Sequence, residues 1–206
     1  ATIATLQQEG AMDRNRAHAL PHPTQRIALI GSPGTSGFRD FVTHLLKNEW
    51  GLRYDVHVFP AVVQGKESPA TVIEALKLAA GIEPHVIALV RGGGSALDLD
   101  AFNDLDMCRA IADSPVPVLT GIGHETDLSV ADMVAHSAFK TPTAVADFLV
   151  ERSLKEWSRL VDWTGQMQTL VNHRLAIERQ ALARHGQTLR IQPRQQLHLA
   201  STSLNH

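Results

Sequence analysis

The sequence has little cysteine, few aromatic residues and no long apolar run. Its 206 residues include one cysteine, Cys108, and aromatic residues make up 5% of the chain. A lone cysteine excludes an internal disulfide and a cysteine-rich zinc site, so we expect a reducing, cytoplasmic setting. No apolar run approaches the roughly 18 residues that span a bilayer, which excludes a membrane-spanning protein. What remains is a globular chain, 44% apolar, that can bury one good core.

Common nucleotide- and metal-binding motifs are also missing. The turn Gly31-Ser32-Pro33-Gly34 lacks the Lys-Ser/Thr ending of a P-loop, and no GxGxxG with a downstream acid is present. The segment His124-Glu125-Thr126-Asp127 does not have the HExxH spacing of a zincin. The chain starts without methionine and its first residues do not resemble a signal peptide, so we expect a piece of a longer protein.

Charge is distributed unevenly, although the net charge is only −2. Acidic residues outnumber basic ones up to residue 150, and basic residues outnumber acidic ones from residue 151 onward. The basic carboxyl-terminal part either attracts nucleic acid or an acidic partner, or presents an ordinary solvated helix face. Composition leaves both interpretations open.

Short apolar runs alternate with helical patterns in the first two thirds of the sequence. These runs occupy residues 27–30, 56–60, 86–90 and 116–120. Buried parallel strands have this character, and strands that alternate with helices at this spacing form βαβ units. We therefore predict an α/β fold with a parallel, Rossmann-like or flavodoxin-like sheet in residues 21–140, after a leading helix and basic linker in residues 1–20. Pro117 places the fourth strand toward a sheet edge.

The carboxyl-terminal third follows a different pattern. Thr141 is predicted to cap a helix that has Pro142 at its first position. Apolar residues then recur at steps of three and four, which is typical of a heptad seam in a coiled-coil-like helix that binds a partner helix. We expect this extension, residues 141–206, to stay helical to about residue 185. Gly186 and Pro193 are predicted to end the helix, with a short helix or a disordered segment beyond.

Polar residues follow three of the predicted strands. Asp40 is expected in the first turn of the helix after the first strand, Arg91 directly follows the third strand, and His124 and Asp127 follow the fourth. Ligands of open α/β sheets bind beyond the carboxyl ends of the strands, so we predict that these side chains converge on one crevice. The same loops hold further candidate substrate contacts, at a predicted anion site. These are Ser32, Gly92, Gly93, Gly94 and Ser95.

Each feature also has a plain structural explanation when taken alone. Glycines can make a tight turn, Arg91 can anchor a loop, and Asp40 can favour a helix dipole. Their coincidence at three strand ends favours phosphodiester cleavage. Arg91 and the glycine amides would neutralise phosphate charge in the transition state, and His124 would transfer a proton. Asp127 would orient the imidazole or share a divalent metal with Asp40. Asp132 is expected either to support the site residues from behind or to be structural, and Asn103 is expected to cap the helix that follows.

Several distinctive motifs occur between residue 9 and about residue 150. They are Glu9-Gly10-Ala11-Met12-Asp13, Ser32-Pro33-Gly34, Arg39-Asp40, Val63-Gln64-Gly65, Arg91-Gly92-Gly93-Gly94-Ser95, Phe102-Asn103, Ser114-Pro115-Val116-Pro117-Val118, Gly123-His124-Glu125-Thr126-Asp127 and Thr141-Pro142-Thr143. In order and spacing they closely resemble the large subunit of bacterial exonuclease VII. The Arg-Gly-Gly-Gly-Ser and Gly-His-Glu-Thr-Asp pair is highly specific.

The resemblance implies a cytoplasmic DNA-repair nuclease that degrades single-stranded DNA from either end into short oligonucleotides. It implies Asp40, Arg91, His124 and Asp127 as the essential positions, and leaves open whether no cofactor is required or Mg²⁺ is used. Family members carry an amino-terminal OB-fold and a long helical region that binds copies of a small helical subunit. We expect the small subunit, or a second copy of this chain, to bind the helical extension, and this fragment to be inactive alone.

The chain departs from the family pattern in two places. Thr35-Ser36-Gly37-Phe38 stands where small residues and an aliphatic one are usual, and residues 135–140 lack the usual acid and arginine. Neither segment includes one of the four proposed catalytic positions. Two other functions stay open, namely a non-catalytic phosphate- or nucleotide-binding module and a scaffold that assembles partners through its heptad helix.

Overall fold

A computed structural model describes residues 2–92, 96–122 and 128–203 of the chain. Side chains are described in these ranges except at residues 96–98, 188 and 190–203. The chain divides into two compact units, Ala1–Glu156 and Trp157–His206. The first unit contains the sheet, and the second is helical.

Five parallel strands form the sheet of the first unit. They are β1 (Arg26–Gly31), β2 (Asp55–Pro60), β3 (Val86–Val90), β4 (Val118–Gly121) and β5 (Ser137–Ala138), in the spatial order β2-β1-β3-β4-β5. The predicted parallel α/β fold is confirmed. Because β2 and β3 lie on opposite sides of β1, the chain reverses its direction of travel across the sheet there. Doubly wound sheets bind ligands at such a switch point, here between the carboxyl ends of β1 and β3.

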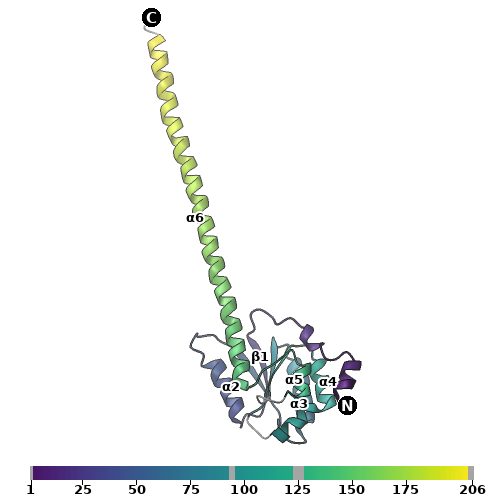
Figure 1. Cartoon of the computed structure of the whole chain (residues 1–206). Helices are drawn as coiled ribbons and strands as arrows, with labels where there is room; N and C mark the ends of the chain where they lie inside the picture. Colours follow the sequence, from purple (N-terminus) through teal and green to yellow (C-terminus); the bar gives the residue numbers. More distant parts are fainter. Residues whose placement is uncertain (1, 93–95, 123–127, 204–206) are drawn as a thin grey trace. The chain divides into compact units, whose positions relative to one another are not determined.

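Helices cover both faces of the sheet (Figure 1). They are α1 (Thr2–Gln8), η1 (Asn15–Ala17), α2 (Ser36–Leu46), α3 (Ser68–Ala80), η2 (Ala96–Asn103), α4 (Leu105–Ala112), α5 (Val130–Val134) and α6 (Pro142–Ser203). Alternate side chains of β1 point to opposite layers, as the strand period requires. Ala28 and Ile30 lie in the core under α3 and α4, whereas Ile27 and Leu29 lie in the core under α2 and the first turns of α6.

The sequence-based prediction missed β5 and therefore misplaced β4. β5 pairs with β4 through Leu119 opposite Ser137, so β4 lies inside the sheet and not at its edge. A two-residue strand is too short to show an alternating pattern, which is why the sequence gives no sign of it. Pro117 lies just before β4, and its carbonyl accepts a hydrogen bond from the Ile87 N–H at 2.9 Å.

One predicted helix cap is confirmed and another is not. The Thr141 hydroxyl accepts a hydrogen bond from the Ala144 N–H at 3.1 Å, so Thr141 caps α6 as predicted. Helix α4, however, is capped by Asp104, whose carboxylate accepts a hydrogen bond from the Met107 N–H at 2.9 Å. The prediction of Asn103 as the cap was wrong by one residue, because both residue types suit this position.

Helix α6 continues to Ser203, past the predicted end at Gly186 and Pro193. A glycine costs about 1 kcal/mol and a proline about 3 kcal/mol in a helix interior, and these local costs do not end a helix of 62 residues. Apolar side chains of the second unit are exposed, for example Trp157 at 63% and Leu170 at 69%. The coiled-coil pairing of these side chains stays a prediction.

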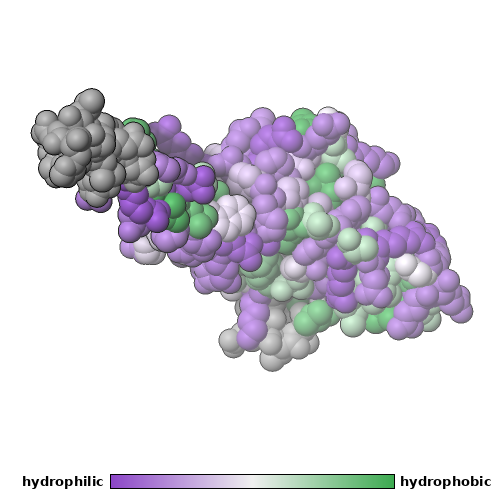
Figure 2. Space-filling view, turned by 90° about the horizontal axis from the view of Figure 1, so that it is seen from above, coloured by the Kyte–Doolittle hydropathy of each residue, from purple (hydrophilic) through white to green (hydrophobic). Residues whose placement is uncertain are grey.

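Hydrophilic residues predominate on the face of the molecule seen in Figure 2, and hydrophobic residues reach the surface there in small separate patches. None of the helices, over the residues that the structure describes, combines the length and apolarity needed to cross a membrane.

Candidate active site

The loops that follow β1 and β3 touch each other through glycines. A Cβ on Gly37, at the start of α2, would lie 2.7 Å from the Gly92 Cα. A Cβ on Gly92 would lie 2.7 Å from the Thr35 Cβ. Such distances are far inside van der Waals contact, so only glycine allows this approach. The sequence thus brings the two loops together at the switch point between β1 and β3.

Two more glycines bring the other elements of this edge together. A Cβ on Gly31, the last residue of β1, would lie 2.8 Å from the carbonyl oxygen of Val90 at the end of β3. A Cβ on Gly121, at the end of β4, would lie 3.0 Å from the Thr141 carbonyl oxygen, just before α6. The carboxyl ends of three strands and the starts of two helices therefore share one tightly packed edge.

Of the predicted site residues, four lie within the described part of the chain. Ser32 is half-buried in the loop after β1, and Gly92 is buried in the loop after β3. Arg91 is 3% exposed, although arginine is rarely buried in proteins. Asp40 is exposed and lies in the second turn of α2, because the helix starts at Ser36 and has no acidic residue in its first turn.

Asp40 nevertheless lies on the side of α2 that approaches the loop after β3. It follows Gly37 by three residues, and positions three apart share one side of a helix.

The remaining predicted site residues lie outside the described residues. These are Gly93, Gly94, Ser95, His124 and Asp127.

Asp132 joins the two described ends of the loop that follows β4. One of its carboxylate oxygens accepts a hydrogen bond from the Thr120 hydroxyl at 2.5 Å, and the other accepts bonds from the Ser129 hydroxyl at 2.7 Å and the Ser129 N–H at 3.1 Å. All three residues are buried, and Ser129 and Asp132 form a capping box at the start of α5. Asp132 therefore has the structural role expected of it.

Asn103 joins the loop after β3 to the loop after β4. Its side-chain oxygen accepts a hydrogen bond from the Val130 N–H at 2.9 Å, across 27 residues of sequence. Sequence reasoning assigned Asn103 to a helix cap and missed this role, because a tertiary hydrogen bond leaves no periodic pattern. Asn103 and Asp132 together hold Thr120, Ser129 and Val130 in place by hydrogen bonds.

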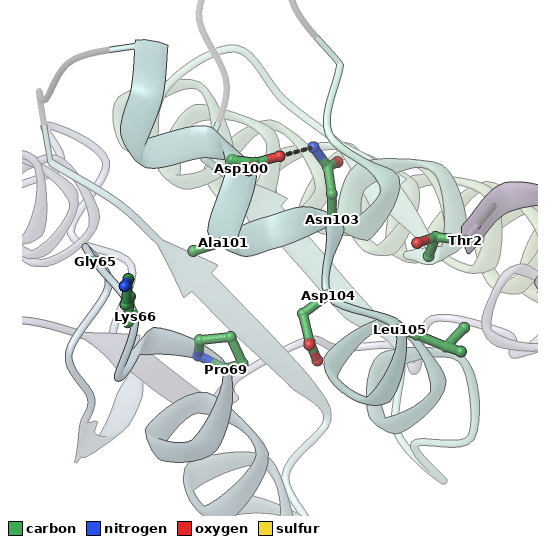
Figure 3. A pocket seen from close by; sticks show the side chains of 9 residues that line it. All are labelled: Thr2, Gly65, Lys66, Pro69, Asp100, Ala101, Asn103, Asp104 and Leu105. Atoms are coloured by element: carbon green, nitrogen blue, oxygen red, sulfur yellow. Dashed lines mark hydrogen bonds between the residues drawn. The ribbon is translucent and has the colours of Figure 1, made fainter.

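A cavity of about 590 Å³ opens between the loop after β2 and η2 (Figure 3). Lys66 lines one side and the carboxylates of Asp100 and Asp104 line the other. Asp100 accepts a 3.4 Å hydrogen bond from the Asn103 amide, and Asp104 is the cap of α4. Because two carboxylates would repel a phosphate, we assign this cavity no catalytic role.

The described side chains also limit the choice of nucleophile. Burial raises the pKa of the Cys108 thiol to about 12, so this cysteine is not a thiolate at neutral pH. Within the described residues, no three His, Cys, Asp or Glu side chains gather in a way that could hold a metal ion. The predicted metal-binding pair includes Asp127, which lies outside those residues.

Taken together, the edge is suited to bind an anion. A guanidinium presents several N–H donors in a planar fork that matches the oxygens of a phosphate. Arg91 lies at the switch point, beside the backbone of Gly92 and the start of α2. A helix start adds N–H donors and partial positive charge.

Comparison with known proteins shows the family of this chain. The family model described as "Exonuclease VII, large subunit" matches residues 11–206. Over 171 residues the chain is 39% identical to the "Exodeoxyribonuclease 7 large subunit" of Nitrosomonas eutropha, which covers 82% of this chain and 38% of that protein. The protein of the same description from Nitrosomonas europaea is 38% identical over 204 residues, or 95% of this chain and 44% of that protein.

A relative from a third bacterium gives the same result. The "Exodeoxyribonuclease 7 large subunit" of Brevibacillus brevis is 35% identical over 202 residues, which covers 95% of this chain and 43% of that protein. The chain thus spans less than half the length of these curated relatives. The family match extends over almost the whole sequence and includes every element from β1 to α6. The chain belongs to the exonuclease VII large-subunit family.

Proposed function

We propose that this chain hydrolyses phosphodiester bonds of single-stranded DNA and releases short oligonucleotides, as the catalytic part of an exonuclease VII large subunit. One observation carries the proposal most directly. A glycine contact joins the loops after β1 and β3, and the buried Arg91 directly follows β3 at this end of the sheet, where ligands of such folds bind. The names of the relatives give the nuclease class.

In the proposed reaction, a water oxygen attacks the phosphorus atom and the bond to the leaving oxygen breaks. Arg91 and the amides of residues 92–94 stabilise the negative charge that builds on the phosphoryl oxygens. His124 removes the proton from the water or supplies one to the leaving oxygen. Asp127 orients the imidazole or, together with Asp40, holds a divalent cation such as Mg²⁺; a reaction without a metal is the alternative.

The helical part of the chain is proposed to bind the small subunit of the enzyme. Its support is the exposure of apolar side chains along α6, such as Trp163 at 60% and Met167 at 65%. Large exposed apolar surfaces commonly mark protein interfaces. We keep the division into a leading segment (1–20), a catalytic core (21–140) and a helical extension (141–206), and a cytoplasmic DNA-repair role, as parts of this proposal.

The test is cleavage of an end-labelled single-stranded oligonucleotide by the large subunit assembled with its small subunit. We expect His124→Ala and Asp127→Ala each to lower the rate by at least about 100-fold, the usual effect of removing a proton-transfer group. The control is His57→Ala, because His57 is an exposed histidine on β2. Parallel reactions with EDTA decide between the metal-dependent and metal-free forms. Binding of the strand without any cleavage by the parent would instead support the non-catalytic module.

A further inference from the structure

A second cavity, of about 420 Å³, opens between the carboxyl end of β2 and helix α3. Ser32, a predicted substrate contact, lies in its wall, and Thr35 at the end of the same loop touches Gly92. The cavity therefore borders the same loop that approaches the proposed phosphate site.

The wall of this cavity is suited to a flat apolar group and not to a phosphate. Phe59 presents a half-buried aromatic ring whose other contacts are with the core under α3. Val62 and Leu78 line the rim and are 42% and 60% exposed. Glu74 is the one charged residue of the described wall, and its carboxylate would repel a phosphate.

Hydrogen bonds hold this wall in place without a ligand. The Thr71 hydroxyl, on α3, accepts a hydrogen bond from the Val62 N–H at 3.1 Å. The same hydroxyl lies 3.1 Å from the Val62 carbonyl and 3.2 Å from the Ser68 carbonyl, and it can donate to either. The loop after β2 is thus tied to α3, so little order has to be gained when a ligand enters.

We propose that this cavity holds a nucleobase of the bound strand, with the Phe59 ring as the stacking surface. The inference rests on the proposed function, since the phosphate of the same strand would lie beside Arg91. Aromatic side chains stack on any base, so such a cavity accepts many sequences. A base in a duplex is stacked and paired, and it must leave the duplex to enter. The cavity therefore supplies a physical reason for action on single strands.

Glu74 indicates which nucleobases the cavity is expected to prefer. A carboxylate accepts a hydrogen bond from an exocyclic amino group, such as N4 of cytosine, and thymine has no such group. Glu74 is exposed and lines the cavity together with Phe59. We expect the cavity to prefer cytosine to thymine.

The experiment measures binding of short fluorescent oligonucleotides to this chain by anisotropy. It compares an oligonucleotide of deoxycytidines with an abasic one of the same length, which keeps every phosphate. The parent is expected to bind the intact strand about tenfold more tightly. Phe59→Ala is expected to remove this difference, and so is Val62→Trp, which fills the cavity with a side chain and leaves the backbone hydrogen bonds in place. Thymidine strands are expected to bind less tightly than cytidine strands, and Glu74→Gln to reduce that preference.

Leu78→Ala is a further test variant, and Leu46→Ala is its matched control. Both leucines are exposed, at 49% and 60%, but only Leu78 lines the cavity. Equal binding of intact and abasic strands by the parent, or an unchanged difference in both Phe59→Ala and Val62→Trp, would overturn the inference. Cleavage measurements separate it from the proposed function. If strands bind in a base-dependent way but the assembled enzyme does not cleave them, only the proposed nuclease function is contradicted. If cleavage is unaffected by Val62→Trp and by abasic sites, only the proposed nucleobase cavity is contradicted.

Discussion

At the amino ends of β4 and β5 one buried side chain makes four hydrogen bonds, whereas at the carboxyl ends of β1 and β3 the backbone segments meet through bare glycines. The Asn15 side chain accepts from the N–H groups of Val118 and His136, at 2.8 Å and 3.1 Å. It donates to the carbonyls of Ser114 and Val116, at 3.2 Å and 3.1 Å. Every hydrogen-bonding group of this amide is used within the protein.

At the carboxyl edge, by contrast, the residues leave space beside the backbone. Gly31, Gly37 and Gly92 add no side chains, and the loops that they bring together border a cavity lined by Ser32. A buried guanidinium, Arg91, lies at the same place. The comparison assigns a stabilising role to the amino edge and agrees with the proposal that the carboxyl edge binds the ligand. Substitutions at the two edges should therefore separate stability from activity.

The largest effect on stability is expected at the amino edge. Asn15→Ala removes all four of these hydrogen bonds in a site where Asn15 is 0% exposed. The Ser114 carbonyl, the Val116 carbonyl and the His136 N–H each keep a second contact, whereas the Val118 N–H loses its acceptor. A hydrogen bond contributes about 0.5–1.5 kcal/mol and a buried unsatisfied group costs about 1–3 kcal/mol, so we expect the free energy of unfolding to fall by about 3 kcal/mol. Urea unfolding measures this. Asn172→Ala, on the exposed face of α6, should change it by less than about 0.5 kcal/mol. Equal effects of the two substitutions would remove the distinction between the edges.

A smaller effect on stability and a larger one on activity are expected from Gly37→Ala. The added methyl group would meet the Gly92 backbone at 2.7 Å and push the two loops apart. Overpacking of this kind costs about 1–3 kcal/mol, and here it also displaces the backbone beside Arg91. Gly34→Ala is the control, because nothing lies within 4 Å of a Cβ at this position of the same loop. Strand cleavage should fall sharply for the first variant only, and full activity of Gly37→Ala would show that the contact is not needed.

The smallest effect is a pH dependence at the amino edge. Burial lowers the pKa of His136 from its usual 6.5, and its ring contacts the His18 carbonyl at 3.1 Å. As the pH falls, the unfolded chain therefore binds a proton at His136 before the folded chain does. Protonation of His136 thus lowers the free energy of unfolding below about pH 6.5 and has no such effect above that pH. The free energy of unfolding should decrease less between pH 7.5 and pH 5.5 in His136→Gln than in the parent. Parallel curves for the two proteins would contradict the shift.

The sequence predicted most of the sheet because buried strands carry apolar runs that flanking turns delimit. β5 escaped, since Ser137 and Ala138 form no such run. Asn15 and Asn103 escaped as well, because their partners lie about 100 and 27 residues away and no local pattern encodes them. The end of α6 was predicted too early, since the local cost of Pro193 does not stop a long helix.

For the candidate site, strand ends predicted which loops would meet, and Ser32, Arg91 and Gly92 lie on loops that do. The prediction that Asp40 lies in the first turn was wrong by about one residue, because α2 begins at Ser36 and not later. Helix boundaries depend on capping contacts that a single sequence defines only to within a few residues. The catalytic roles themselves stay predictions.

The ratio of cleavage rates of two arginine variants, in the assembled enzyme, tests most directly whether the carboxyl edge is the catalytic edge. Arg91→Ala removes the buried guanidinium after β3, and Arg26→Ala removes an exposed one at the amino end of β1. Urea unfolding shows whether each variant is folded. We predict that Arg91→Ala lowers the rate on an end-labelled single strand by about 100-fold or more and that Arg26→Ala leaves it within about twofold. Equal rates for a folded Arg91→Ala variant and the parent would contradict the assignment.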